Sequence, residues 1–361
     1  MQTVLDMPTT STATVSQADA QRVASSYVAD QIDPAFEVVE GTRGHHKRLG
    51  REIWQFIIRS VHGPLDTIAV DLQTGAVIPL AADKIRLIRE KAAIYAARKR
   101  NVLPVDADGY VLAEFARRQV SSYLDEHLSM FYEGADPVFV TTPRPVWQVT
   151  IVFKQYHLGP FTLGVMDVDA QTGEPLPLTA NQIKRIRERT RAIIRHTTPT
   201  AAADDHEVGR EPFGWRHCLA ACAVMVLEYL GVTVDEKRLR RRLGTTAEGT
   251  PFPNITRLQT LGLFLHYGKK GDLSIFERYL ASGLPVIVGV KTLAWQHWGD
   301  EVTRHAVVVV GIDQENNLIY IHDPFFADAP IAMSILRFEI GWEELDRQYA
   351  VIGLTALEDQ S

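Results

Sequence analysis

The fold of the C-terminal half of this chain is decided by residues 215–231, which read WRHCLAACAVMVLEYLG. No Pro or Gly interrupts the stretch before Gly231, and Gly is common just after the end of a helix. The pattern therefore predicts one apolar helix with Cys218 in its first turn. Unpaired backbone N–H groups and the positive end of the helix dipole favour an anion there, and hence a thiolate. Cys222, one turn deeper, is expected to be buried and inert.

A thiolate acts as a catalyst only when a base and a group that holds the base lie beside it. A second apolar segment, residues 304–313 (RHAVVVVGID), predicts a strand that is covered on both faces, with His305 at its beginning. The following strand, residues 318–322, ends at Asp323. Because strands of a hairpin lie side by side, Asp323 can reach the imidazole of His305 and hold its tautomer. The three groups occur in the order Cys, His, Asp.

Each of these residues also has an ordinary structural explanation. A free Cys is often a small core residue, a His can simply begin a strand, and Asp323-Pro324 is a common turn sequence. Taken together, their order and context favour a nucleophilic thiol site over three unrelated structural residues.

The C-terminal segment resembles peptidase family C39-like domains, which belong to the papain-like cysteine peptidases. The resemblance covers about residues 208–355 and rests on five motifs in order: Cys218-x-Ala-Ala, Leu243-Gly-Thr-Thr with Gly249-Thr250, Gly283-Leu-Pro-Val-Ile-Val, His305-Ala-Val-Val and Asp323-Pro324. It implies that Cys218 is the nucleophile, that His305 is the general base and acid, and that Asp323 orients His305.

Two positions depart from the family pattern. The family usually has a Gln several residues before the Cys, whose amide donates to the oxyanion, but residues 211–217 (EPFGWRH) contain none. The residue after the Cys, typically Gly, is Leu219. Loss of one oxyanion donor commonly costs ~10²–10³ in rate. The remaining donor candidates are the backbone N–H of Cys218 and the side chains of Trp215, Arg216 and His217.

An aromatic segment, residues 295–298 (WQHW), lies just before the strand of His305. It predicts either one wall of a peptide cleft or a loop packed on the surface. Gln296 is a further candidate for the missing amide, and Trp298 is a candidate for substrate contact. The histidines here lack the spacing of a metal site, and the chain has no Gly-rich phosphate loop, so neither a metal nor another cofactor is expected.

The first half of the chain contains an internal repeat. Trp54-Gln55 recurs as Trp147-Gln148 (147 − 54 = 93), and residues 70–75 (VDLQTG) recur as residues 168–173 (VDAQTG; 168 − 70 = 98). Each copy predicts a helix, alternating strands with a Thr-Gly hairpin turn, and a closing helix. The pattern resembles PepSY-like domains.

These patterns predict an α+β protein of three domains. Residues 1–15 form a flexible lead-in, and residues 196–210 form a small polar linker. PepSY-like repeats occupy residues 16–98 and 108–195. A papain-like domain, whose central helix packs on an antiparallel sheet, occupies residues 211–357.

The composition excludes several classes of function. The net charge is −6 (38 − 44), which gives no general attraction for nucleic acid. No apolar run approaches the ~20 residues that span a membrane. Two Cys residues make no disulfide framework, so a reducing cytoplasm is expected. Basic runs at residues 184–195 and 237–242 predict solvated helix faces or surfaces that attract an acidic substrate or partner.

We therefore predict a thiol-dependent peptidase that cleaves a peptide or protein substrate through an acyl-enzyme, without a cofactor. Two alternatives stay open. The missing Gln and Leu219 favour a papain-like module that binds or recruits a peptide without turnover. In a transglutaminase-like acyl transferase, an amine would replace water. The N-terminal repeats are expected to present substrate, shield the cleft or recruit a protein partner.

Overall fold

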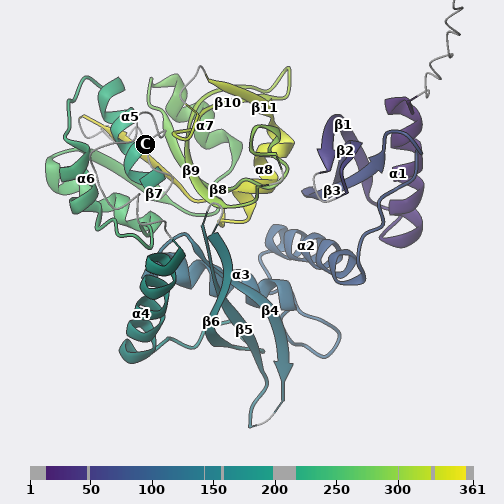
Figure 1. The fold of residues 1–361 in the computed structure, drawn as a ribbon, viewed down its shortest axis with the longest axis horizontal. Coiled ribbons are helices and arrows are strands. Elements are labelled where there is room, and N and C mark those ends of the chain that lie inside the picture. Colours follow the sequence, from purple (N-terminus) through teal and green to yellow (C-terminus); the bar gives the residue numbers. More distant parts are fainter. Residues whose placement is uncertain are drawn as a thin grey trace, which may run out of the picture. The chain divides into compact units, whose positions relative to one another are not determined.

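The computed structural model describes residues 14–46, 49–141, 143–155, 158–197, 217–299, 301–326 and 330–354. The chain is an α+β protein with two small three-stranded antiparallel sheets followed by a six-stranded antiparallel sheet (Figure 1). It divides into two compact units, Met1–Ala92 and Ala93–Ser361. Most of the predicted lead-in and linker lies outside the described residues.

The first unit pairs a helix with a three-stranded sheet. Its elements are α1 (Gln17–Gln31), β1 (Glu37–His46), β2 (Arg51–Ser60) and β3 (Gly63–Asp71), and α2 (Ala82–Arg100) begins within it. Strand β2 pairs with both neighbours and carries the buried side chains of Phe56, Ile57 and Ile58. The side chain of Ser16 caps α1 by accepting the backbone N–H of Asp19.

The second unit opens with the same order of elements. They are α3 (Ala113–His127), β4 (Tyr132–Val140), β5 (Val146–Gln155), β6 (Leu158–Asp169) and α4 (Ala180–Thr197). We call this part the second repeat and its counterpart in the first unit the first repeat.

Matched hydrogen bonds show that the internal repeat is present in the structure as well as in the sequence. In each copy the repeated Trp donates its indole N–H to a carbonyl just before the first helix, and a helix Tyr hydroxyl accepts a backbone N–H after the third strand. The pairs are Trp54 with Val15 (3.0 Å), Trp147 with Val111 (2.8 Å), Tyr27 with Leu80 (3.0 Å) and Tyr123 with Leu178 (3.1 Å).

The remainder of the second unit is built on the six-stranded sheet, in the order β11-β10-β9-β8-β12-β7. Its elements are α5 (Cys218–Tyr229), α6 (Glu236–Leu243), η3 (Phe252–Leu261), β7 (Phe264–Gly268), α7 (Leu273–Ala281), β8 (Val286–Lys291), η4 (Gln296–Trp298), β9 (Arg304–Asp313), β10 (Leu318–His322), β11 (Ile331–Ser334), α8 (Ile335–Glu343) and β12 (Tyr349–Gly353).

Strand β9 is covered on both faces, as its apolar sequence predicts. Ala306 and Val308 belong to the hydrophobic cluster that contains α5, whereas Val307 and Val309 belong to the cluster that contains α7 and α8. This alternation is the period of two expected for a strand between two layers. The sheet thereby holds α5 at a fixed position against β9.

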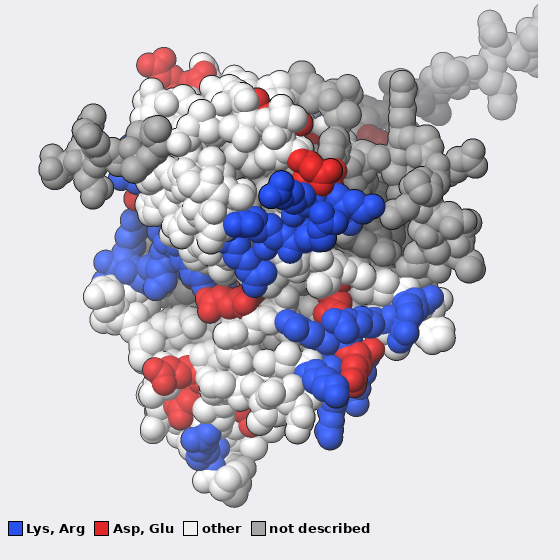
Figure 2. Space-filling model, turned by 90° about the vertical axis from the view of Figure 1, so that its left-hand side faces the viewer, with Lys and Arg blue, Asp and Glu red and all other residues white. Residues whose placement is uncertain are grey.

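Two helices of the second unit, α4 and α6, carry the predicted basic runs. Lys and Arg side chains gather in bands on the face where these helices lie, with Asp and Glu beside them (Figure 2). Arg191 of α4 pairs with Glu248 at 2.6 Å, and Arg240 of α6 lies 4.0 Å from Glu236. The basic faces are thus partly neutralised within the chain. Their attraction for an acidic partner stays a prediction.

Among the described residues, no helix has both the length and the apolar character that a membrane crossing demands.

Candidate active site

The sheet and α5 bring together the three residues that the sequence singles out. Cys218 is the first residue of α5, His305 is the second residue of β9, and Asp323 directly follows β10. His322 lies opposite Val308 in the antiparallel pair, so the chain after β10 continues toward the start of β9. Nε2 of His305 lies 2.8 Å from Oδ1 of Asp323, and both side chains are buried.

The environment of His305 stabilises its protonated form. Burial lowers the pKa of this imidazole, but the carboxylate of Asp323 and hydrogen bonds with Asp323 and the thiol of Cys218 outweigh burial. The pKa of His305 is raised from 6.5 to about 10. Because Nε2 is engaged by Asp323, Nδ1 is the ring nitrogen that is left for the thiol.

Asp323 is held by donors on several sides. Oδ2 accepts the indole N–H of Trp298 at 2.9 Å and lies 3.5 Å from Nε2 of His297. Oδ1 accepts the backbone N–H of Phe325 at 2.9 Å as well as its bond from His305. Burial raises the pKa of Asp323, but the charge on His305 and the hydrogen bonds from both histidines bring it well below its usual range. The side chain is therefore a carboxylate at neutral pH.

Aromatic rings surround the pair formed by His305 and Asp323. The ring of Trp298 meets the imidazole edge to face at 5.1 Å between centroids. The same indole also packs against Phe325 at 5.0 Å and Phe326 at 5.6 Å. Exclusion of water lowers the local dielectric constant and strengthens the attraction between the two charges.

The second cysteine has the inert environment that the sequence predicts. Cys222 is fully buried, and its Sγ donates to the carbonyl oxygen of Ala306 at 3.2 Å. Burial raises the pKa of this thiol well above its usual value. Its thiolate is therefore not populated at neutral pH.

The oxyanion and substrate candidates that the structure describes have different surroundings. Trp215 and Arg216 lie outside the described residues. His217 directly precedes α5, and its Nε2 lies 2.5 Å from a guanidinium nitrogen of Arg240. Gln296 is exposed in η4. Trp298 is buried and uses its indole N–H on Asp323, which makes it a support of the carboxylate rather than a surface for substrate.

One neighbour of the thiol has no signal in the sequence. Sδ of Met130 lies 3.5 Å from Sγ of Cys218. Met130 belongs to the loop between α3 and β4 of the second repeat, at a position without periodicity or motif. Only the packing of this repeat against the thiol identifies it.

The described residues hold no cluster of three or more His, Cys, Asp or Glu side chains of the kind that binds a metal ion. The groups at the site form hydrogen bonds and ion pairs with one another instead.

The sequence from residue 204 to residue 350 matches the model of the Peptidase_C39 like family. Residues 204–350 form a C39-like peptidase domain. This domain contains Cys218, His305 and Asp323 as well as nearly all of the six-stranded sheet. No curated protein matches the chain.

Solved structures also match part of this chain, and three of them are the following. A protein from Bacillus anthracis described as a C39-like peptidase is 18% identical, over 38% of this chain and 88% of that one, with a TM-score of 0.31. The peptidase domain of ComA from Streptococcus, a bi-functional ABC transporter, is 25% identical, over 39% and 93%, with a TM-score of 0.32. A double glycine motif protease from an AMS/PCAT transporter, in complex with the leader peptide, is 19% identical, over 40% and 88%, with a TM-score of 0.26.

Proposed function

We propose that this chain is a cysteine peptidase that cleaves a peptide or protein substrate through Cys218, His305 and Asp323. One observation carries the proposal: a buried imidazole with a raised pKa, held by a carboxylate, adjoins a thiol at the first residue of a helix. A merely structural Cys does not need a charged base beside it. The papain-like assignment of the domain is part of the same proposal.

The proposed reaction conserves protons at each step. His305 takes the proton of Cys218, and the thiolate attacks the carbonyl carbon of the scissile peptide bond. His305 then returns the proton to the leaving amine, which departs and leaves a thioester on Cys218. Water loses a proton to His305 and attacks the thioester, and the acid product leaves as the thiol regains its proton. Asp323 keeps the imidazole in one orientation throughout.

Oxyanion stabilisation is the weakest part of this mechanism. As the first residue of α5, Cys218 has a backbone N–H without a partner inside the helix, and this group is one donor for the developing negative charge. Residues 211–217 contain no Gln to supply the second donor. We therefore expect turnover that is slow compared with family members that have the Gln.

The proposal treats the two repeats as PepSY-like units that serve the peptidase by presenting substrate, covering the site or recruiting a partner. The matched hydrogen bonds of Trp54 and Trp147 support a common origin of the first repeat and the second repeat.

The test is a prolonged digest of a diverse peptide library, followed by mass spectrometry, with wild type, Cys218→Ala and Cys222→Ala. Wild type and Cys222→Ala should release the same products, whereas Cys218→Ala should release none. Cys222→Ala is a matched control because it removes a buried thiol from the same helix. Products that persist in Cys218→Ala would show that another group performs the cleavage.

A second candidate function is a module that binds a peptide without turnover. Leu219, the absent Gln and the burial of Cys218 favour it. In that case no products appear in the digest, although peptides from the library are retained by the immobilised chain. If products joined to an added amine replace hydrolysis products, the chain is an acyl transferase instead.

A further inference from the structure

We propose that the second repeat keeps this site inactive, because the side chain of Met130 covers the thiol of Cys218. We call this state latency. The inference rests on the proposed function, because it concerns the regulation of the same site. It predicts that the chain in the conformation described here does not admit a substrate, and that displacement of one loop opens it.

The contact between the two sulfur atoms blocks the place that a substrate must take. Sδ of Met130 lies 3.5 Å from Sγ of Cys218, and the two side chains are 1% and 3% exposed. A scissile carbonyl carbon must come within ~3–3.5 Å of the attacking sulfur. The thioether already fills space at that range, so the substrate and Met130 exclude each other.

The loop that carries Met130 is attached to the C39-like domain on one side through the segment after α6. The hydroxyl of Ser129 donates to the carbonyl oxygen of Glu248 at 2.6 Å, and the hydroxyl of Tyr132 donates to the carboxylate of Glu248 at 3.2 Å. Gly249 lies so close that a Cβ atom there would come 2.4 Å from the ring of Phe131. The loop that carries Met130 is therefore closely packed against the segment after α6.

Strand β4, which directly follows the loop, is attached beside His305. The guanidinium of Arg304 donates to the carbonyl oxygen of Tyr132 at 2.6 Å, and Lys291 of β8 pairs with Glu133 at 2.7 Å. Arg304 directly precedes His305 in β9. The loop and the start of β4 thus have contacts next to the proposed nucleophile and the proposed base.

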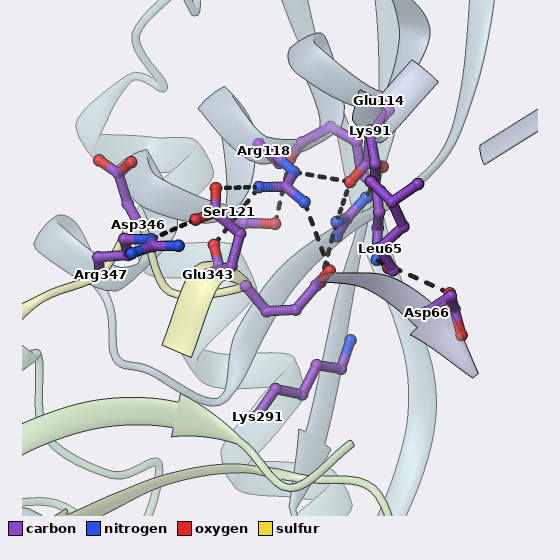
Figure 3. A network of polar contacts seen from close by, with 12 residues as sticks. Leu65, Asp66, Lys91, Glu114, Arg118, Ser121, Lys291, Glu343, Asp346 and Arg347 are labelled. Atoms are coloured by element: carbon purple, nitrogen blue, oxygen red, sulfur yellow. Dashed lines mark hydrogen bonds and ion pairs between the residues drawn. The ribbon is translucent and has the colours of Figure 1, made fainter. Parts of the chain in front are cut away.

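A charged network attaches α3, the helix before this loop, to α8. Arg118 lies between Glu114 of its own helix, at 2.8 Å, and Glu343 of α8, at 3.0 Å (Figure 3). Arg117 pairs with Glu344 at 3.1 Å. The second repeat is thus joined to the C39-like domain by ion pairs at α8 as well as by the hydrophobic cluster that contains Met130 and Cys218.

The fold of the repeat does not itself require a methionine at this position. In the first repeat, the backbone N–H of Phe36 donates to the carbonyl of Asp33 at 3.1 Å. In the second repeat, Tyr132 donates to Ser129 at 3.2 Å, an offset of 96 at both residues. The position equivalent to Met130 is Pro34, which is exposed. The same turn thus forms without a long apolar side chain.

The experiment measures alkylation of the full chain by iodoacetamide, with the modification of Cys218 followed over time by peptide mass spectrometry. In wild type, Cys218 should react slowly. In Met130→Ala, its rate should rise by at least about tenfold, because the truncated side chain no longer covers the sulfur. Cys222 in the same chain should react slowly in both proteins and reports global unfolding.

Met166→Ala is the matched control. Met166 is a buried methionine on β6 of the same repeat, so its truncation loosens the core without uncovering the thiol. Its Cys218 should react at the wild-type rate. Equal rates in wild type and Met130→Ala, or fast alkylation of wild-type Cys218, would overturn the inference.

A second variant keeps the test informative if Met130→Ala does not fold. Glu133→Gln removes the ion pair with Lys291 and leaves the core of the repeat intact. It should raise the alkylation rate of Cys218 by a smaller factor than Met130→Ala. A rate that stays at the wild-type value would contradict the attachment proposed here.

Cleavage assays on the same proteins separate the two proposals. If Met130→Ala exposes the thiol but cuts no peptide, latency stands and the peptidase proposal fails. If wild type and Met130→Ala cut peptides at the same rate, the peptidase proposal stands and latency fails.

Discussion

One carboxylate, that of Asp323, determines the ionisation of the proposed site. It faces His305, His297 and Trp298 from a buried position. A buried ion pair has a cost in desolvation, and removal of one partner leaves the other charge buried and uncompensated. The consequences of this arrangement for stability depend on pH and can be measured.

Asp323→Asn should destabilise the second unit by about 3–5 kcal/mol at pH 6. In the folded chain the pKa of His305 is raised from 6.5 to about 10. The stability from its protonated form is therefore fully present below pH 6.5 and is lost as the pH rises through about 10. The difference between wild type and variant in denaturant titrations should accordingly shrink from pH 6 to pH 10.

The control for this series is Asp313→Asn, on the same strand as His305. Asp313 bonds to Asn316 at the exposed end of β9, so its substitution should change the free energy of unfolding by less than about 1 kcal/mol. A difference for Asp323→Asn that is constant from pH 6 to pH 10 would contradict the raised pKa of His305.

Trp298→Phe tests the support of Asp323 from its other side. The change keeps an aromatic ring but removes the N–H that donates to Oδ2. A hydrogen bond to a buried charge is worth about 1.5–3 kcal/mol. The variant should lose that much stability and, in the Met130→Ala background, should show slower alkylation of Cys218 at pH 6.

Trp295→Phe is the counterpart of this variant in the same segment. Its indole N–H donates to the carbonyl oxygen of Arg337, away from the carboxylate. Trp295→Phe should lower the free energy of unfolding by only about 0.5–1.5 kcal/mol and leave the alkylation rate of Cys218 unchanged. Equal alkylation rates in the two Trp variants would show that Trp298 only fills space.

The three proposed catalytic residues could be predicted from the sequence alone. The side chains that surround them could not. Cys218 and His305 each begin an element whose apolar pattern is local and readable, so their positions follow from the sequence. The part played by Trp298 depends on the direction in which a short 3-10 turn presents its side chains. No local pattern sets that direction, which is why the residue was expected at the substrate instead.

At the scale of elements, patterning predicts the continuous strands better than the interrupted ones. β2, β5, β9 and β10 have unbroken apolar or alternating sequences and were expected. β1 and β4 were not, because each is interrupted by an irregularity in pairing, between Val39 and Thr42 and between Ala135 and Val138. A bulge shifts the period of two and hides the strand from a periodicity argument.

The position of α8 against β8 is set by a close approach at one glycine. A Cβ atom on Gly341 would come 2.3 Å from the backbone oxygen of Lys291. Ala is otherwise favoured over Gly in a helix by about 1 kcal/mol. Gly341→Ala should nevertheless destabilise the second unit by about 1–3 kcal/mol in denaturant titration, because the backbone must move apart.

Gly164→Ala provides the comparison for this substitution. Gly164 lies on β6 and has nothing within 4 Å of the added carbon. Its free energy of unfolding should stay within about 0.5 kcal/mol of wild type. A stable Gly341→Ala variant would mean that α8 and β8 are less closely packed than described.

At the scale of the whole molecule, the second repeat and the C39-like domain lie in one compact unit. Their division into separate domains stays a prediction. The residues that join them, such as Met130, Glu133 and Lys291, occur singly along the chain and form no motif. Hydrophobic patterns predict the individual helices and strands. They do not predict contacts between two parts of the chain that are made by single, scattered side chains.

The charged network between these parts should respond to acid. Burial raises the pKa of Glu114, but the charges and hydrogen bonds of Arg117 and Arg118 outweigh it and lower the pKa to about 2. The stability from this carboxylate is present above its ordinary value of 4.5 and is lost as the pH falls through about 2. The denaturation midpoint of the second unit should therefore fall between pH 5 and pH 2.

Glu114→Gln should remove part of this dependence on pH and lower the midpoint at pH 7. Glu188→Gln is a suitable control, because Glu188 is exposed on α4 and lies 3.9 Å from Lys184. Glu188→Gln should leave both the pH dependence and the denaturation midpoint at pH 7 nearly unchanged. If Glu114→Gln keeps the full wild-type dependence on pH, other carboxylates cause the loss of stability in acid.

The turn that the two repeats share has a consequence for how the proposed activity can be adjusted. The same backbone turn forms with proline in one copy and with methionine in the other, so the turn itself does not fix the residue at its tip. If the latency proposed above holds, the length and shape of the side chain at position 130 set how often the sulfur of Cys218 meets the solvent. A series of substitutions there should then give chains in which Cys218 reacts at stepped rates, while the proposed catalytic groups remain untouched.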